Sequence, residues 1–345
     1  MVLIHEQITA ANIGGFYNAV TQGVNETLGQ RLFPVRKQLG LDLSFIKGAM
    51  GRAVALRPSA FDVKTTLRDR MSIDITTEEM PFFKEGLLVK ERDRQELNTV
   101  AMTGNQTLID TVLKRIFDDE VTLIQGAKAR LEAMRMQVLA TGRLAVNANG
   151  VALDYDYGVS EANRGKAETP WSEVGATPLA DIESAIEALE NLGGKADVMV
   201  LNSVTFNQLK NAESTLNVIN PVTKAKPTRN QVFDYLSSNY DIQLEIVNDT
   251  YVDDDGQVKK FYPDGYVSFV PNATLGATVF GTTPEESDLV SSQVANVSVV
   301  ETGIAVTTVK ENDPVNVLTK VSMIALPSFE GINQVYFLNV GEDEI

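Results

Sequence analysis

The sequence contains no cysteine and only one histidine, His5, among its 345 residues. Without cysteine the chain has no disulfide, no thiolate metal ligand and no cysteine nucleophile, which suits a reducing compartment. With a single histidine, Ser-His-Asp catalysis, histidine metal clusters and histidine proton shuttles are excluded. We therefore expect no catalytic residue, no metal ion and no cofactor in this chain.

Basic side chains are also scarce, since 30 Lys and Arg residues stand against 46 Asp and Glu residues and give a net charge of −16. Nucleic-acid binding relies on Lys and Arg to neutralise phosphates, so this balance argues against a surface that grips DNA or RNA. It is compatible with a surface that lies beside packed DNA in weak, non-specific contact. No apolar run approaches the roughly 18 residues that cross a bilayer, so no membrane partner is expected.

Two motifs resemble ligand sites but fail on their spacing. With Gly256 of Asp253-Asp254-Asp255-Gly256 at the sixth position of a calcium loop, positions one and twelve are Tyr251 and Tyr262, where acidic ligands are required. The motif therefore predicts a hairpin turn, with weak cation binding as the alternative. Gly193-Gly194 closes a predicted helix rather than opening one, so its N–H groups do not cradle a phosphate.

The strongest positive signal is one long amphipathic helix over Thr107–Thr141. Its apolar positions recur every 3.6 residues or so, with one polar step at Glu120. Asn105 is placed to cap the start of the helix, and Gly142 is placed to end it in a left-handed conformation. Such a helix is about 50 Å long. It suits a strut, and a coiled-coil arm or a domain-linking helix remain alternatives.

The first 42 residues lack the apolar content for a core of their own. Residues 8–28 show weak helical periodicity, and Leu32–Val35 is predicted to be extended because Pro34 excludes the residue before it from helical space. We expect this segment to pack on the body of the protein or on a neighbouring copy.

Residues 43–90 predict a long, charged hairpin. Arg52–Leu56 forms one strand, and the alternation of Met71, Ile73 and Ile75 with polar residues indicates another. An isolated two-stranded ribbon is marginally stable in water, so we expect this hairpin to be held by partners.

The aromatic pair Phe82-Phe83 either anchors the base of this hairpin in the core or forms a contact between subunits. Both interpretations remain open from the sequence. The candidate subunit-interface residues are Arg52, Lys64, Arg68, Arg70, Glu78, Glu79, Phe82 and Phe83.

A separate α/β block begins near Trp171, whose indole is interpreted as a core or interface anchor, with ligand stacking as the alternative. The predicted helices are residues 179–192, 204–213 behind a Ser203 cap, and 230–239 behind a Thr228/Gln231 capping box. The predicted strands are residues 197–201, 242–247, 258–262 and 266–270, with a hairpin of residues 143–146 and 151–157 before the block and strand-rich segments 294–308 and 314–340 after it.

A series of short motifs runs through the second half of the chain. They are Trp171 with Pro178–Ile182, Val270–Gly276, Phe280–Glu286, Asp313–Val315 and the strand Lys320–Phe329, preceded by Glu132–Gly142 in the long helix. In this order and spacing they resemble the major capsid protein E family of tailed phages. The first 90 residues match that family in the order of their predicted elements more than in residue identity.

The resemblance implies an α+β, Hong Kong-type capsid fold. Residues 1–42 are then an N-terminal arm, 43–90 an extended loop, 91–170 the spine helix with peripheral-domain strands, 171–293 an axial domain, and 294–345 strands that complete both domains. It also implies self-assembly into hexamers and pentamers of an icosahedral head around double-stranded DNA, in a virion assembled in the host cytoplasm. Scaffold, portal or decoration proteins are further expected partners, and the family carries no catalytic residues.

Three alternatives remain at this point. An encapsulin-like nanocompartment shell has the same fold but encloses a protein cargo. A tail or scaffold protein of the same virus is a second alternative. A carboxylate-dependent hydrolase is the third, because 46 acidic residues offer many pairs, although none stands out as a constellation.

Overall fold

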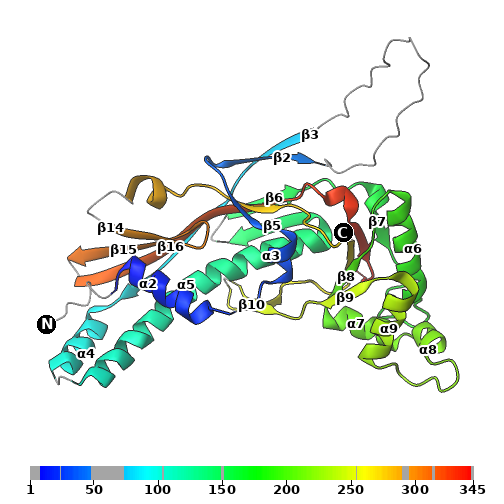
Figure 1. Cartoon of the computed structure of the whole chain (residues 1–345), viewed down its shortest axis with the longest axis horizontal. Coiled ribbons are helices and arrows are strands. Elements are labelled where there is room, and N and C mark those ends of the chain that lie inside the picture. The colour runs from blue at the N-terminus through cyan, green and yellow to red at the C-terminus, as the bar shows by residue number, and fades with distance from the viewer. Residues whose placement is uncertain are drawn as a thin grey trace, which may run out of the picture. The chain divides into compact units, whose positions relative to one another are not determined.

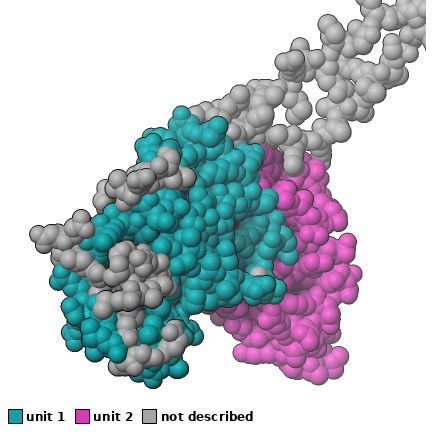
Figure 2. Space-filling model, turned by 60° about the vertical axis from the view of Figure 1, so that its left-hand side comes forward, with its two compact units in different colours: residues 1–43, 78–134, 277–328 teal, residues 44–77, 135–276, 329–345 magenta. Residues whose placement is uncertain are grey.

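The computed structural model describes residues 8–23, 25–47, 74–102, 105–148, 151–253, 255–289, 295–312 and 315–342. The predicted strand Arg52–Leu56 and the interface candidates Lys64, Arg68 and Arg70 lie outside these residues, as do Arg52 itself and His5. The chain divides into two compact units, teal and magenta in Figure 2. Unit 1 comprises residues 1–43, 78–134 and 277–328, and unit 2 comprises residues 44–77, 135–276 and 329–345.

Unit 1 is built on a six-stranded sheet in the order β1-β13-β16-β15-β14, with β4 also pairing with β16. Figure 1 labels β14, β15 and β16 of this sheet. Its strands are β1 (Val35–Lys37), β4 (Phe82–Val89), β13 (Ala277–Phe280), β14 (Ala295–Val300), β15 (Ile304–Asn312) and β16 (Val315–Ser328). Its helical elements are α2 (Ala10–Thr21), α3 (Leu28–Leu32), α4 (Glu91–Met102), the first part of α5 (Gln106–Thr141) and a π-helical turn, η2 (Glu285–Leu289). Strands β2 (Asp42–Lys47) and β3 (Asp74–Glu79) form a two-stranded sheet of their own.

Strand β16 is the centre of the unit 1 sheet, because it pairs antiparallel with β15, β4 and β13. Side chains alternate between the two faces of a strand. Val317, Val321 and Met323 on one face of β16 are buried, and so are Ser322 and Ile324 on the other. The strand is therefore covered on both faces, as its β-branched and apolar composition favours.

The long helix is confirmed as α5, which begins one residue earlier than predicted. The Asn105 side-chain oxygen accepts from the N–H groups of Thr107 and Leu108, at 3.1 and 3.4 Å. Gly142 has a φ of +68° and its N–H donates to the Val138 carbonyl at 2.8 Å, which ends the helix as predicted. The helix runs from the residues of unit 1 into those of unit 2, so it links the two units in the chain.

Helix α4 was not predicted. Its sequence begins Glu91-Arg92-Asp93-Arg94-Gln95-Glu96 and shows no apolar stripe, so periodicity gives no signal there. The guanidinium of Arg115 on α5 lies 2.9 Å from the Glu96 carboxylate, which ties the two helices together at the surface.

The N-terminal segment packs on unit 1, the first of the two alternatives left open by its composition. Helix α2 contacts β14 and β15, and Tyr17 is buried with its hydroxyl donating to Glu301 at 2.7 Å. The Lys128 ammonium on α5 lies 2.9 Å from the same Glu301 carboxylate oxygen. These contacts anchor the segment to the rest of its own chain.

The prediction of an extended chain over Leu32–Val35 is only partly correct. Leu32 is the last residue of α3, and the extended structure begins at Val35, where β1 pairs in parallel with β13. The cause is the capping box that Thr27 and Gln30 form at the start of α3, which favours one short helical turn before Pro34.

Unit 2 contains a five-stranded sheet in the order β7-β17-β12-β8-β9. Its strands are β5 (Arg143–Ala148), β6 (Val151–Asp156), β7 (Arg164–Lys166), β8 (Val198–Leu201), β9 (Gln243–Ile246), β10 (Thr250–Val252), β11 (Val258–Lys260), β12 (Tyr266–Val270) and β17 (Tyr336–Asn339). Its helices are α6 (Pro178–Asn191), α7 (Ser203–Asn211), α8 (Glu213–Ile219) and α9 (Arg229–Tyr240), with short 3₁₀ turns at Glu161–Asn163 and Ile332–Gln334. The sheet and helices enclose an apolar cluster that includes Trp171, Leu189, Met199 and Phe269.

Most predicted elements of this α/β block are confirmed within a few residues, including the capping box of Thr228 and Gln231 at α9. One cap is wrong: Asn202, not Ser203, accepts from the N–H of Thr205 and caps α7. The helix predicted to run to Glu213 ends at Asn211, because Ala212 has an extended backbone with a ψ of 136°. A separate helix, α8, which was not predicted, begins at Glu213.

Candidate functional site

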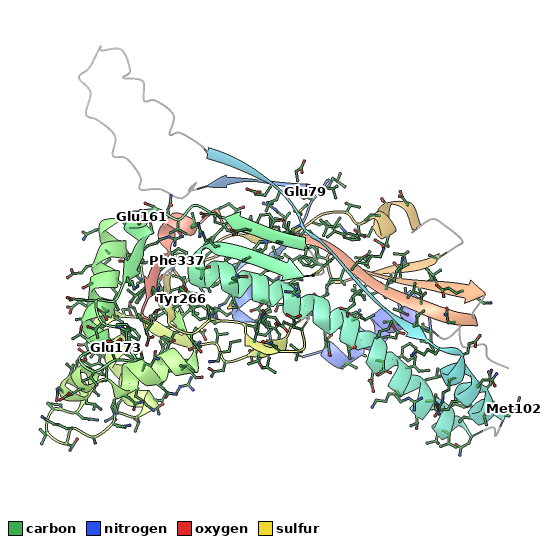
Figure 3. The ribbon with its side chains drawn as sticks, turned by 180° about the vertical axis from the view of Figure 1, so that it is seen from behind. Glu79, Met102, Glu161, Glu173, Tyr266 and Phe337 are labelled. Atoms are coloured by element: carbon green, nitrogen blue, oxygen red, sulfur yellow. The ribbon has the colours of Figure 1, made fainter. Side chains whose placement is uncertain are left out.

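The described interface candidates lie where β3 leads into β4. Glu79 at the end of β3 is exposed and Glu78 is half-buried (Figure 3). Phe82 is 47% exposed, whereas Met80 is 4% exposed, so Met80 rather than Phe82 fills the core at the base of this hairpin. Phe83 is half-buried. The core-anchor interpretation therefore does not hold for Phe82.

Sequence inspection missed two apolar side chains on the same strand. Leu87 and Leu88 are 39% and 46% exposed, and successive residues of a strand point to opposite faces. Together with Phe82 they give β4 exposed apolar surface on both faces. A signal was present, because Gly86-Leu87-Leu88-Val89 is an apolar run in an otherwise charged hairpin.

The buried carboxylate of Glu285, on η2 of unit 1, contacts side chains of β4 and β16. The Lys84 ammonium lies 3.3 Å from Glu285, and the Ser322 hydroxyl donates to the same carboxylate at 3.0 Å. Burial alone would raise the pKa of Glu285, but a backbone N–H, Ser322 and Lys84 outweigh it and lower that pKa. Glu285 is therefore ionised and holds the η2 turn against the sheet.

Glu120, the polar step in the predicted apolar stripe of α5, is the second buried carboxylate of unit 1. It is 1% exposed, and its Oε2 has no hydrogen-bond partner in the described part of the chain. Burial raises the pKa of Glu120 to about 7, partly offset by the nearby Thr319 on β16. Near neutral pH this carboxyl group titrates inside the protein.

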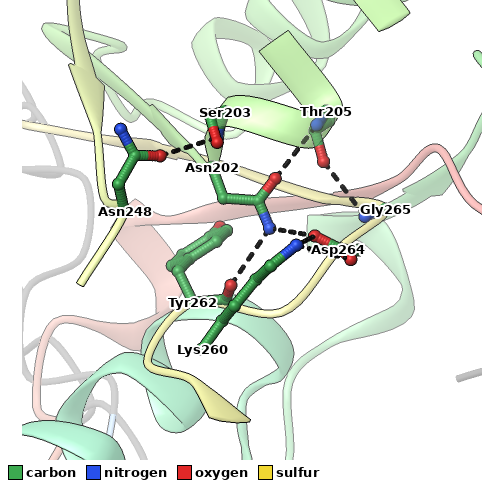
Figure 4. A network of polar contacts seen from close by, with 8 residues as sticks. All are labelled: Asn202, Ser203, Thr205, Asn248, Lys260, Tyr262, Asp264 and Gly265. Atoms are coloured by element: carbon green, nitrogen blue, oxygen red, sulfur yellow. Dashed lines mark hydrogen bonds and ion pairs between the residues drawn. The ribbon is translucent and has the colours of Figure 1, made fainter. Parts of the chain in front are cut away.

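A polar network in unit 2 joins the start of α7 to the loop before β12 (Figure 4). The Asn202 side chain accepts from the Thr205 N–H at 3.0 Å and donates to the Tyr262 carbonyl at 3.1 Å and to Asp264 at 2.5 Å. The Lys260 ammonium lies 2.7 Å from Asp264. Every group in this network has a structural partner, so the network fixes loops rather than offering a reactive group.

The Asp253–Gly256 motif is confirmed as the hairpin turn between β10 and β11. The Asp253 carboxylate accepts from the N–H groups of Asp255 and Gln257, at 3.0 and 2.8 Å. The Lys259 ammonium lies 2.6 Å from its other oxygen. These contacts use the carboxylate that a cation would need, which disfavours the alternative of weak cation binding.

Trp171 is a core anchor, as preferred from the sequence. It is 2% exposed, and its indole N–H donates to Asp181 on α6 at 2.8 Å. Burial raises the pKa of Asp181, partly offset by this hydrogen bond. Trp171 is also part of the wall of a surface pocket of ≈540 Å³, between the loop that follows it and helices α7 and α8.

This pocket was not predicted, because its walls come from separate parts of the sequence. Its lining residues are Trp171, Ser172, Glu173, Val174, Gly175, Val204, Asn207, Gln208, Asn211, Ala212 and Glu213. Apolar side chains, amides and two carboxylates line it together.

Among the described residues, no group of three or more His, Cys, Asp or Glu side chains is arranged to hold a metal ion. None of the helices in the same part of the chain combines the length and apolar character that a membrane span requires.

The family model of the phage major capsid protein E matches residues 17–340. The chain belongs to the phage major capsid protein E family. Members of this family are structural proteins of the phage capsid, so this capsid protein is a component of the virion. The matched region includes the motifs from Trp171 onward, and it also includes most of the N-terminal segment.

Solved structures place this capsid protein in the Hong Kong-type fold. It is similar to a prophage protein of Escherichia coli CFT073 described as a capsid protein, with 15% identity, a TM-score of 0.53, and coverage of 77% of this chain and 79% of that one. A capsid protein of cyanophage A-1(L) gives 13% identity and a TM-score of 0.53 over 92% of each chain. A phage-related protein of Bordetella bronchiseptica RB50 gives 12% identity and a TM-score of 0.53 over 96% of this chain and 98% of that one. No curated protein sequence matches the capsid protein.

Proposed function

We propose that this capsid protein assembles with copies of itself into hexamers and pentamers of an icosahedral head that encloses double-stranded DNA. The observation that carries the proposal is the family match over residues 17–340. The fold supports it, because the likeness to the cyanophage capsid protein extends over 92% of both chains. The function is then structural and needs no catalytic group.

The acidic composition supports a weak contact with the enclosed DNA. With a net charge of −16, the shell repels phosphates overall. A wall of this kind keeps packed DNA from adhering, so that the genome leaves the head freely. Scaffold, portal or decoration proteins are further partners in this proposal, and assembly takes place in the host cytoplasm.

Strand β4, with apolar side chains exposed on both of its faces, is the proposed contact between copies. Phe82, Leu87 and Leu88 are between 39% and 47% exposed there, which is apolar surface that a neighbouring copy would cover. Arg68 and Arg70, outside the described residues, belong to the same proposed contact. In this arrangement residues 1–42 serve as the arm, 43–90 as the extended loop and 171–293 as the axial domain.

Electron microscopy of the expressed protein, combined with sedimentation and nuclease treatment, tests the proposal. We expect closed shells or ringed capsomers, and nuclease-protected DNA in particles taken from infected or induced cells. A compact monomer at every concentration would contradict the proposal. Particles that contain a defined protein cargo and no DNA would instead identify a nanocompartment shell.

A control separates assembly from folding. Reversing the charges of Arg68 and Arg70 together should block assembly, while the fluorescence of Trp171 in unit 2 should stay that of the folded protein. Normal shells from this double variant would remove these two residues from the interface.

A further inference from the structure

An exposed loop in unit 2, residues 220–227 between α8 and α9, presents an apolar side chain flanked by two cations. Val222 is 94% exposed, and Lys224 and Lys226 are exposed beside it. Neither lysine forms an ion pair within the described residues. Two neighbouring cations give this loop a local positive charge in a chain whose net charge is −16.

This loop is held in one conformation by its own hydrogen bonds. The Lys224 N–H donates to the Asn220 carbonyl at 2.8 Å, and the Asn220 side-chain amide donates to the Ala225 carbonyl at 3.0 Å. Lys224 adopts a φ of 48°, a left-handed conformation that the surrounding bonds maintain. A loop fixed in advance loses little conformational entropy when it binds.

The pocket of ≈540 Å³ beside Trp171 has complementary properties. Val174 and Val204 supply apolar surface, and Val174 is itself 97% exposed. The exposed carboxylates of Glu173 and Glu213 line the same pocket, which gives it negative charge (Figure 3 labels Glu173). The Ser214 hydroxyl donates to the Ala176 carbonyl at 2.8 Å and joins the two walls of the pocket.

The loop and the pocket lie at opposite ends of the same short helix. Glu213 begins α8 and the loop follows its last residue, Ile219, so the 7-residue helix separates them by about 10 Å. Because Val222 is 94% exposed, the loop does not fill the pocket of its own chain. Two complementary patches at different places on one subunit produce head-to-tail contacts between copies. Such contacts close into a ring when the rotation from one subunit to the next divides a full turn evenly.

We propose that Val222 of one copy enters the pocket beside Trp171 of the next copy, while Lys224 and Lys226 pair with Glu173 and Glu213. The partner is therefore a second copy of this chain, and the contact repeats around a ring of subunits. This inference rests on the proposed function, because it assigns one of the contacts by which the capsid protein assembles.

Cysteine cross-linking tests the contact directly, since the natural sequence has no cysteine that would interfere. The double variant Val222→Cys/Val174→Cys, assembled and then treated with a short bis-maleimide, should give a ladder of covalent oligomers on a denaturing gel. Each single variant should stay monomeric on the same gel, because its thiols do not meet. Absence of the ladder from particles that electron microscopy shows to be assembled would overturn the proposal.

Charge exchange gives an independent test. Lys224→Glu/Lys226→Glu and Glu173→Lys/Glu213→Lys should each raise the protein concentration needed for half-assembly by about tenfold or more. Combining all four substitutions should restore assembly toward the natural level, because the ion pairs form again with reversed polarity. The control Lys114→Glu/Lys166→Glu changes the net charge by the same amount as Lys224→Glu/Lys226→Glu, at exposed positions outside the contact, and should leave assembly close to natural.

The outcomes distinguish this inference from the proposed function. If the natural protein forms no rings or shells under any condition, the proposed function itself fails. If it assembles but the ladder is absent and the fourfold variant is no better than the double variants, only the loop–pocket contact is overturned. Particle images that show the pocket empty or filled by another molecule lead to the same conclusion.

Discussion

Units 1 and 2 differ in how their buried polar side chains are paired. In unit 1, the buried oxygens of Glu120, Thr307, Asn316 and Thr319 have no hydrogen-bond partner among the described residues. In unit 2, Ser268 donates to the Leu139 carbonyl at 2.6 Å and Asn163 donates to the Val335 carbonyl at 2.9 Å. Asn202 forms the network of Figure 4, and Thr215 is the exception in the described part of unit 2.

This difference predicts which changes should alter the stability of each unit. An unpaired buried polar group costs about 1–3 kcal/mol, so unit 1 carries a penalty in α5 and in its sheet that unit 2 largely avoids. Unit 2 should respond to the loss of packing or of a hydrogen bond, and unit 1 should respond to pH and to removal of its unpaired groups. The following four variants test this contrast, from the largest expected effect to the smallest.

Phe269→Ala should destabilise unit 2 by about 3–5 kcal/mol, because Phe269 on β12 is fully buried in the apolar cluster and its loss leaves a cavity. Urea unfolding followed by fluorescence measures the effect, since the only tryptophan, Trp171, lies in the same cluster. Val258→Ala, at a position that is 71% exposed, is the control and should change little. A similar loss in both variants would contradict the assignment of this core.

Glu120→Gln should stabilise unit 1 at pH of about 8 by roughly 3 kcal/mol and by much less at pH of about 5. Burial raises the pKa of Glu120 from 4.5 to about 7 in the folded state. The folded state therefore binds more protons than the unfolded state between these values, and the natural protein loses stability as the pH rises through 7. Glutamine carries no charge and avoids that loss.

Urea-dependent hydrogen exchange of peptides from α5 and β16, compared between variant and natural protein at each pH, measures this difference. Asp118→Asn changes an exposed carboxylate on the same helix and serves as the control. An equal gain for Glu120→Gln at both pH values would show that the charge of Glu120 is not responsible.

Asn202→Ala should destabilise unit 2 by about 1–3 kcal/mol, because it removes the cap of α7 and leaves Asp264 and the Tyr262 carbonyl without their amide donor. Trp171 fluorescence in a urea titration measures the loss. Thr228→Ala, which removes only the cap of α9, should cost about 1 kcal/mol and sets the scale. If the two variants lower the free energy of unfolding equally, the hydrogen bonds of Figure 4 contribute no stability beyond that of the helix cap.

Thr27→Ala should cost about 1 kcal/mol and act only on the attachment of the N-terminal segment. The Thr27 hydroxyl caps α3 and donates to Glu132 on α5 at 2.7 Å, at an exposed position. Limited proteolysis within residues 25–37 should become faster, whereas Thr27→Ser keeps the hydroxyl and should not change the rate. A loss of stability in the whole of unit 1 would show that this segment contributes more than its surface contacts indicate.

The sequence predicted those parts of the fold that local chemistry determines. Asn105 and Gly142 delimit α5, Thr228 and Gln231 cap α9, and Gly256 lies in the predicted hairpin turn, because each of these signals acts within a few residues. Helix α4 was missed, because its stability comes from context rather than from an apolar stripe.

The candidate sites were less predictable, because they depend on contacts between distant parts of the chain. The low apolar content of residues 1–42 suggested dependence on other copies as one alternative, yet Ile13, Tyr17 and Phe33 are all buried in their own chain. A few large side chains that pack on a sheet built from residues near 300 are sufficient to attach this segment to its own chain. The pocket beside Trp171 combines residues 171–175 with residues 204–213, a proximity that no local pattern reports.

The pairing of β4 with β16 determines when the unit 1 sheet forms during synthesis. Val89 on β4 pairs with Val317 on β16, and Val35 on β1 pairs with Thr278 on β13. The ribosome must therefore release nearly the whole polypeptide before the early strands find their partners, whereas α5 can coil as soon as it emerges. An incomplete nascent chain consequently lacks a finished unit 1 sheet, because β13, β15 and β16 all come from the last quarter of the sequence.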